Sequence, residues 1–238
     1  MSNPSHLQGE FDGGGISPAQ QGRQRQLWEA YFRRSKNLFG TGPNDFARRC
    51  LSVIPKKGGR ILDLGCGEGL DAVFFASHDY DVVGVDFSVT AARSAREDSR
   101  HLERRVQFVV ADMSKGALPF VEKSFDVAFS HLGLHYFDDA KTTQVFAEIR
   151  RVLAPDGIFA FSVKSVHDPQ YGQGTQIGRS MYLLDGHLRH FFDVHYVRRK
   201  IRSFQVLDIQ ETAGDFAGRR SCFIECICRR PAHRVRVP

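Results

Sequence analysis

Residues 61–69, Ile-Leu-Asp-Leu-Gly-Cys-Gly-Glu-Gly, carry the strongest structural signal in the chain. The first four have the apolar character of a short buried strand, and glycines follow at positions 65, 67 and 69. Glycine lets the backbone turn tightly and lets a ligand approach it, with the N-terminus of the next helix beneath. Dinucleotide-binding proteins use G-x-G-x-x-G, so the third glycine here comes one residue early. The pattern predicts a strand–turn–helix ligand site that departs from the dinucleotide type.

Strands and helices alternate on the C-terminal side of this unit. Such alternation indicates a parallel sheet with right-handed crossovers, and uninterrupted apolar runs such as 106–110 fit strands covered on both faces. No helix separates the last two strands, so we expect an antiparallel hairpin at the end. The expected strands are 60–64, 81–85, 106–110, 125–130, 158–163, 204–210 and 221–228, and the expected helices are 23–35, 44–53, 69–77, 90–102, 140–153 and 193–202.

Length and composition fit one globular domain. The chain has 238 residues, of which 42% are hydrophobic and 25% charged, and both values are ordinary for a folded domain. Residues 1–22, rich in Gly, Ser, Pro and Gln, are expected to be a mobile tail. We expect the domain to cover 23–228, with N-terminal helices over 23–59 that can act as a lid, an irregular cap insert over 165–192, and a basic tail over 229–238.

Several classes of protein are excluded or disfavoured. No run of about 18 apolar residues exists, so no transmembrane helix is expected. The N-terminus lacks the basic and apolar regions of a secretory signal, which favours a cytoplasmic protein with reduced thiols. The five cysteines lack zinc spacing, and Cys222, Cys226 and Cys228 are expected to be structural. No metal site is therefore predicted.

The net charge of +6 is concentrated in the two ends of the sequence. Residues 1–59 carry nine Lys or Arg against four Asp or Glu, and residues 219–238 carry six Arg against one Glu. Basic ends can bind nucleic acid, and they also serve as a solubilising fringe. No RNP, zinc-finger or basic-zipper pattern accompanies them, so nucleic acid is disfavoured as a partner but stays open.

Carboxylates end the first three strands of the predicted sheet. Asp86 comes 21 residues after Gly65, where a carboxylate can accept hydrogen bonds from ribose hydroxyls. Asp112 can accept one from an adenine amino group while Met113 packs on the ring. Asp63 precedes the glycine turn and can receive a cationic amino group. Ligands of open α/β sheets bind at the carboxyl ends of the strands, so these groups predict a nucleoside site there.

Residues 60–163 resemble the core of class I S-adenosylmethionine-dependent methyltransferases. The resemblance lies in ILDLGCGEG at 61–69, VVGVDFS at 82–88, VVADM at 109–113, SFDVAFSHLGLHYFDD at 124–139 and IRRVLAPDGIFAFS at 149–162. It implies a Rossmann-like, doubly wound seven-stranded α/β sheet of order 3-2-1-4-5-7-6, mostly parallel with an antiparallel last strand. The length and the flanking segments resemble the small-molecule and tellurite-resistance members.

The resemblance also implies S-adenosylmethionine as cofactor and a role for each matching residue. The glycine loop surrounds the methionine part, with Asp63 near its amino group, and the strand ends hold the nucleoside. The implied cofactor-binding residues are Asp63, Gly65, Gly67, Asp86, Phe87, Asp112, Met113, Ser130 and His131. The N/D-P-P-Y/F motif of many nucleic-acid amino methylases is absent, which disfavours an adenine-N6 or glutamine acceptor.

The acceptor site is expected above the cofactor, where the N-terminal helix and the 165–192 insert meet. Its expected lining is aromatic: Trp28, Tyr31, Phe32, Tyr136, Tyr171, Tyr182 and Phe191. His135 and His190 are the candidate general bases, against the alternative that they only cap or line the pocket. We expect methyl transfer to a small molecule, with an RNA methyltransferase or a non-catalytic S-adenosylmethionine-binding protein as alternatives. The acceptor and the oligomeric state are not indicated.

Overall fold

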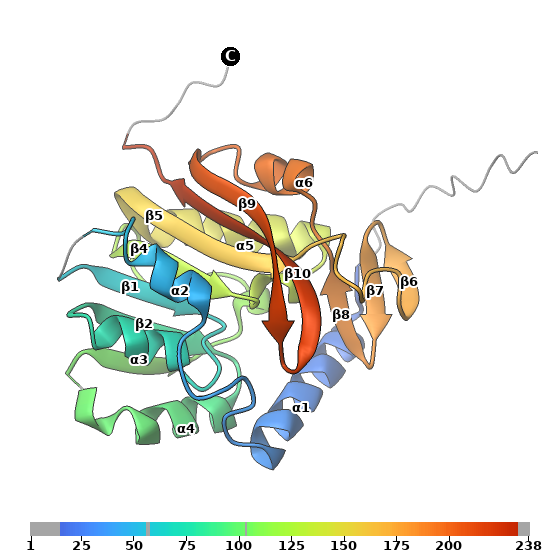
Figure 1. The fold of residues 1–238 in the computed structure, drawn as a ribbon, viewed down its shortest axis with the longest axis horizontal. Helices are drawn as coiled ribbons and strands as arrows, with labels where there is room; N and C mark the ends of the chain where they lie inside the picture. The colour runs from blue at the N-terminus through green and yellow to red at the C-terminus, as the bar shows by residue number, and fades with distance from the viewer. Residues whose placement is uncertain (1–14, 56–57, 103, 233–238) are drawn as a thin grey trace, which may run out of the picture.

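A computed structural model of the chain describes residues 15–55, 58–102 and 104–232. Its central feature is a seven-stranded sheet of order β3-β2-β1-β4-β5-β10-β9 (Figure 1). The strands are β1 (Arg60–Leu64), β2 (Asp81–Asp86), β3 (Val106–Val110), β4 (Phe125–His131), β5 (Leu153–Lys164), β9 (Gln205–Phe216) and β10 (Arg219–Arg229). The first five are parallel, and β10 runs antiparallel to β5 and β9. The predicted fold class and strand order are confirmed.

Helices cover both faces of the sheet. The helices α2 (Asp45–Cys50), α3 (Leu70–Ala76) and α4 (Val89–Asp98) pack on one face, while α5 (Asp139–Val152) and α6 (Val194–Lys200) pack on the other. Alternate residues of β1 divide between the two cores: Ile61 joins the first, and Leu62 and Leu64 join the second. This two-sided burial explains why the parallel strands read as continuous apolar runs.

The N-terminal helix α1 (Pro18–Arg34) begins earlier than expected. The Ser17 hydroxyl caps the helix by accepting from the backbone N–H of Gln20, and the Gln20 side chain accepts from the backbone N–H of Ser17, which completes a capping box. Pro18 occupies the first turn. Residues 18–22, which we predicted to be part of the tail, are therefore helical. Residues 15–17 of the expected mobile tail precede the helix, and residues 1–14 lie outside the described residues.

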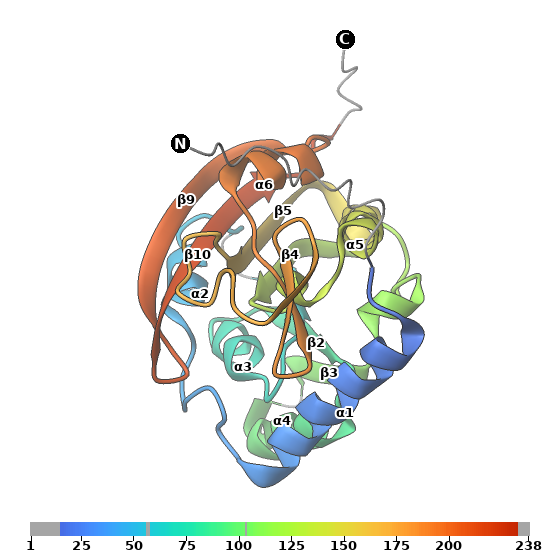
Figure 2. The same cartoon turned by 90° about the vertical axis from the view of Figure 1, so that its right-hand side faces the viewer.

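The 165–192 insert is ordered, contrary to the irregular structure that its glycines suggested. It forms a three-stranded antiparallel sheet of β6 (Thr175–Gly178), β7 (Met181–Leu184) and β8 (His187–His190). Tight turns at Ser180 and at Asp185-Gly186 have positive φ and join the strands, which is how short hairpins reverse direction. The small sheet lies beside α1 at the carboxyl end of the large sheet (Figure 2).

The C-terminal tail also begins later than expected. Arg230 donates hydrogen bonds to the backbone carbonyls of Arg150 and Leu153, and its own carbonyl accepts from Asp156. Residues 229 and 230 therefore belong to the folded domain, and residues 233–238 of the predicted tail lie outside the described part. Among the described residues, no helix is long and apolar enough to cross a membrane.

Candidate active site

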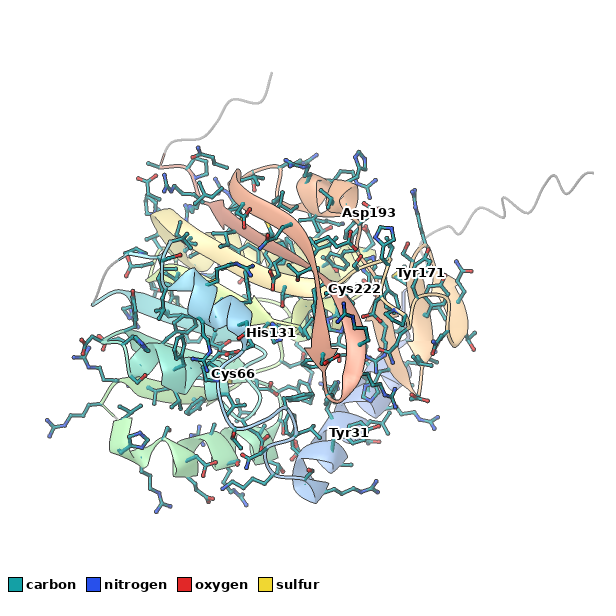
Figure 3. The ribbon with its side chains drawn as sticks, viewed as in Figure 1. Tyr31, Cys66, His131, Tyr171, Asp193 and Cys222 are labelled. Carbon is teal, nitrogen blue, oxygen red and sulfur yellow. The ribbon has the colours of Figure 1, made fainter. Side chains whose placement is uncertain are left out.

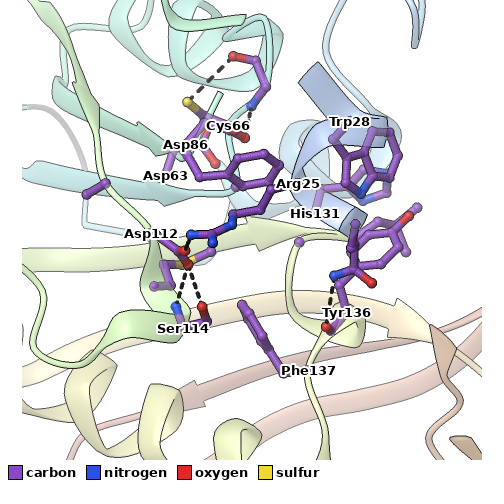
Figure 4. A pocket seen from close by; sticks show the side chains of 18 of the residues that line it. Arg25, Trp28, Asp63, Cys66, Asp86, Asp112, Ser114, His131, Tyr136 and Phe137 are labelled. Carbon is purple, nitrogen blue, oxygen red and sulfur yellow. Dashed lines mark hydrogen bonds and ion pairs between the residues drawn. The ribbon is translucent and has the colours of Figure 1, made fainter. Parts of the chain in front are cut away.

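The carboxyl ends of β1 to β4 line one cleft with a cavity volume of about 170 Å³, and α1 crosses over it (Figure 4). This is the sheet edge at which the strand order reverses between β1 and β4, the place where open α/β sheets bind ligands. Most of the predicted cofactor residues line the cleft: Asp63, Gly65, Gly67, Asp86, Phe87, Asp112, Met113 and His131. Ser130 does not line it, and its hydroxyl instead donates to the carbonyl of Leu64, tying β4 to β1.

All three glycines of the turn have positive φ, and at two of them a Cβ would also meet close neighbours. Gly65 has φ of +73°, and a Cβ there would lie 3.1 Å from the Cα of Gly133. Gly69 has φ of +77°, and a Cβ there would lie 2.6 Å from the ring of Phe108. Only glycine meets both the conformation and the space without strain. The early third glycine therefore serves to pack α3 against β3.

Two carboxylates lie at the methionine end of the expected cofactor position. Asp63 is 2% exposed, and its Oδ2 has no hydrogen-bond partner among the described residues. Burial, followed by the charge of Asp71, raises its pKa well above the usual value. Asp71 accepts from the backbone N–H of Asn44 at 3.0 Å and from its Nδ2 at 2.5 Å, and burial raises its pKa to about 7. An ammonium group placed here would stabilise the ionised form of both carboxylates and so offset the free-energy cost of burying them.

Asp86 ends β2 with a fixed orientation. Its Oδ2 accepts from the backbone N–H of Gly67 at 3.0 Å, and its Oδ1 accepts from that of Ser88 at 2.9 Å. Burial nevertheless raises its pKa above the usual value. Each carboxylate oxygen has room for a second donor, so two neighbouring ribose hydroxyls fit this group.

Asp112 has a partner that the sequence analysis did not anticipate. Its Oδ2 accepts from Nη1 of Arg25 on α1 at 2.5 Å, and its Oδ1 accepts from the backbone N–H and hydroxyl of Ser114 (Figure 4). An adenine amino group would have to share Oδ2 with Arg25 or displace it. The signal for Arg25 in the sequence was slight, because arginine on an amphipathic helix normally faces solvent.

Further contacts hold α1 over the cleft. The carboxylate of Glu29 accepts from the hydroxyls of Ser88 at 2.6 Å and Thr90 at 2.5 Å, at the start of α4. Gln24 accepts from the backbone N–H of Leu188 in β8 and donates to the carbonyl of Tyr136. The N-terminal helix and the insert therefore meet at the cleft, as predicted.

The predicted acceptor aromatics separate into two groups. Trp28, Phe32 and Tyr136 line the cleft, together with Phe39 and Phe216, which the sequence analysis did not single out. Tyr31 stands next to the cleft wall, stacked on His187 with ring centroids 5.7 Å apart.

Tyr171, Tyr182 and Phe191 pack on one another instead, with centroids 5.4 to 6.0 Å apart, and none of them lines the cleft. Figure 3 shows Tyr171 beside the small sheet, while His131 and Cys66 lie at the ends of the central strands. The insert therefore contacts helix α1 through the backbone of Leu188 and the ring of His187. The rings of Tyr171, Tyr182 and Phe191 do not line the cleft.

The two histidines predicted as bases are buried behind the cleft surface. His135 is 1% exposed, both ring nitrogens lack partners among the described residues, and burial lowers its pKa well below the usual value. Nδ1 of His190 lies 3.1 Å from the carbonyl of Phe137, and burial lowers the pKa of His190 to about 4. Neither lines the cleft. Their role as bases stays a prediction that this geometry does not support.

The side chains present fit S-adenosylmethionine. The unpartnered Asp63 oxygen matches an amino group, Asp86 matches a ribose, and the apolar Phe87 and Met113 flank the space for a base. With the strand order 3-2-1-4-5-7-6, these features are those of the class I S-adenosylmethionine-dependent methyltransferase fold.

Comparison with known proteins agrees with that class. Residues 61–157 match the methyltransferase domain family. A Burkholderia thailandensis 1,6-didemethyltoxoflavin-N1-methyltransferase, solved with 1,6-didemethyltoxoflavin and S-adenosylhomocysteine, superposes with a TM-score of 0.72 at 20% identity, covering 97% of this chain and 100% of that one. TehB from Haemophilus influenzae superposes with a TM-score of 0.64 at 13% identity, covering 85% and 67%.

Curated relatives match over part of their length. The malonyl-[acyl-carrier protein] O-methyltransferase of Legionella pneumophila is 30% identical over 151 residues, which are 61% of this chain and 48% of that protein. Across the relatives compared, the chain spans between 19% and 63% of their length. The likeness covers the cofactor domain and leaves the acceptor undefined.

Proposed function

We propose that the protein transfers a methyl group from S-adenosylmethionine to a small-molecule acceptor. The observation that carries the proposal is the buried carboxylate of Asp63, whose Oδ2 has no hydrogen-bond partner among the described residues. This carboxylate lies beside a glycine turn and one strand away from the ribose acceptor Asp86. A buried carboxylate without a partner is costly unless a cation binds there. The methionine ammonium supplies such a cation, and the sulfonium supplies the activated methyl group.

The chain's own residues bind, orient and exclude water. Asp63 and Asp71 hold the amino end, Asp86 holds the ribose, and the aromatic rings of Trp28 and Tyr136 close the cleft from above. Aromatic faces suit a cationic sulfur centre. Methyl transfer from an activated donor depends chiefly on alignment, so an enclosed cleft supplies most of what the reaction needs.

The small size and aromatic lining of the covered space support a small acceptor. Helix α1 lies over the cleft and contributes Gln21, Gln24, Arg25, Trp28 and Phe32 to its lining, which favours a small acceptor over a folded macromolecule. The 1,6-didemethyltoxoflavin-N1-methyltransferase that superposes over nearly the whole chain was solved with 1,6-didemethyltoxoflavin bound.

Calorimetry tests the proposal directly. We expect micromolar binding of S-adenosylhomocysteine and S-adenosylmethionine, with NAD at least a hundredfold weaker. Tighter binding of NAD would overturn the class of ligand. Release of S-adenosylhomocysteine in the presence of a diverse small-molecule panel then separates an enzyme from a protein that only binds the cofactor.

A further inference from the structure

A second cleft opens between α2 and the β9–β10 hairpin, with a cavity volume of about 490 Å³. It adjoins the cofactor cleft, because five residues line both: Phe39, Leu70, Asp71, His131 and Phe216. A molecule in the second cleft therefore lies against side chains that also line the cofactor cleft. His131 is the last residue of β4, and it is the histidine that faces both spaces.

Neighbours on β5 and β9–β10 hold the His131 ring. Its Nδ1 lies 2.7 Å from the hydroxyl of Ser162 on β5. The rings of Phe216 and Phe223 contact it with centroids 5.9 and 6.4 Å away. No hydrogen-bond partner of Nε2 is found among residues 15–55, 58–102 and 104–232. The held ring thus leaves one nitrogen for a ligand.

Burial and hydrogen bonding determine which nitrogen carries the proton. Burial, followed by the charge of Lys164, lowers the pKa of His131 to about 4, so the ring is neutral near pH 7 and carries one proton. Ser162 is fully buried, and its hydroxyl has Nδ1 as its hydrogen-bond partner. Leaving a buried donor unpaired costs free energy, so the hydroxyl donates to Nδ1. The ring proton then lies on Nε2.

The charge of the second cleft disfavours an anionic ligand. Asp45, Asp71, Asp215 and Glu225 line it, against one cation, Arg49, which pairs with Glu225. The rings of Phe39 and Phe216 stack 5.3 Å apart at 16° on the shared wall. Flat, uncharged surfaces pack well against such rings.

We propose that the second cleft holds the methyl acceptor, an uncharged planar molecule with a carbonyl oxygen, and that Nε2–H of His131 donates a hydrogen bond to that oxygen. This assignment rests on the proposed function. Such a bond would fix the orientation of the acceptor beside the cofactor cleft, and a fixed orientation is how a positioning contact accelerates a displacement. His131 takes no proton in this arrangement, because Nε2 already carries one.

Nitrogen NMR of the ¹⁵N-histidine-labelled full chain tests the assignment, with 2-pyridone as the uncharged probe and benzoate as the anionic one. We expect His131 in the Nε2–H form, and a shift of that resonance when 2-pyridone is added to protein saturated with S-adenosylhomocysteine. We expect benzoate to bind at least tenfold more weakly. An Nδ1–H form, or tighter binding of benzoate, would overturn the proposal.

Two variants and a control distinguish loss of the proposed His131 contact from a general loss of folding. His131→Ala should weaken 2-pyridone binding at least tenfold, whereas the control His101→Ala, at an exposed position, should leave it unchanged. Ser162→Ala keeps the imidazole but should leave it a mixture of tautomers and weaken 2-pyridone severalfold. Unchanged 2-pyridone affinity in either His131→Ala or Ser162→Ala refutes the contact.

The two proposals fail in different ways. If the wild-type chain does not bind S-adenosylhomocysteine, the proposed function fails. The His131 tautomer and the binding of 2-pyridone to the cofactor-free chain can still be measured in that case. These two measurements test the proposed acceptor site in the second cleft independently.

Discussion

Cofactor binding should depend on pH through Asp71 and Asp63. Burial raises the pKa of Asp71 to about 7 in the cofactor-free chain, and the ammonium group of the cofactor favours the ionised carboxylate, which lowers that pKa on binding. Affinity is therefore highest above pH 7 and falls as the pH drops below it. With a pKa near 7, about nine-tenths of Asp71 is ionised at pH 8 and about one-tenth at pH 6, which predicts roughly tenfold weaker binding at pH 6.

Calorimetry with S-adenosylhomocysteine at pH 6, 7 and 8, in buffers of different ionisation enthalpy, measures both the affinity and the protons released. About half a proton should leave on binding near pH 7. Asp71→Asn should flatten the profile to less than about threefold, because removing the Asp71 charge also lowers the pKa of Asp63. Asp45→Asn is the matched control, since that side chain is fully exposed, and should keep the full dependence. Equal affinities of the wild type at pH 6 and 8 would refute the reasoning.

Three substitutions and one RNA-binding measurement test other parts of the proposal. Arg25→Ala frees the Asp112 oxygen for the adenine amino group and should tighten S-adenosylhomocysteine binding several-fold, and a loss of affinity in calorimetry would show that Arg25 itself contacts the cofactor. Asp86→Ala should weaken binding by about 1–3 kcal/mol because ribose hydroxyls lose their acceptor, and an unchanged dissociation constant would remove that role. Glu29→Gln should loosen α1, seen as faster hydrogen exchange across residues 18–34 with the melting temperature little changed, whereas unchanged exchange would show that other contacts hold the helix. RNA should bind weakly and lose affinity steeply with salt, so a nanomolar complex at physiological salt in a filter-binding assay would move the acceptor to the RNA class.

The sequence alone was enough for the central domain. The inner parallel strands are buried on both faces and the edge strand β3 is partly exposed. All four of β1 to β4 read as short apolar runs, whose positions could be predicted to within a residue or two. The glycine turn and Asp86 could also be predicted from the sequence. The backbone conformation at Gly65 requires glycine, and the ribose site requires a carboxylate at a set distance along the chain from that turn. Local signals of this kind need no knowledge of distant segments.

The remaining features depend on contacts between distant segments. The sheet β6–β8 looked irregular because its strands are four residues long and separated by glycines, and pairing across the hairpins stabilises them. Arg25 meets Asp112 across 87 positions of sequence, and the spacing of charges along α1 gives no sign of that partner. His135 and His131 are four residues apart, and the local sequence does not show which of the two rings faces a cleft.

Tertiary packing alone decided between those two histidines. The ring of His135 is buried behind the cleft wall, whereas that of His131 lies where the β9–β10 hairpin closes a second cleft against α2. The sequence by itself determined the class of cofactor, because the groups that bind it follow directly after strands with strong local patterns. The proposed acceptor region depends on the tertiary structure, because α2, the end of β4 and the C-terminal hairpin come together there from distant parts of the chain.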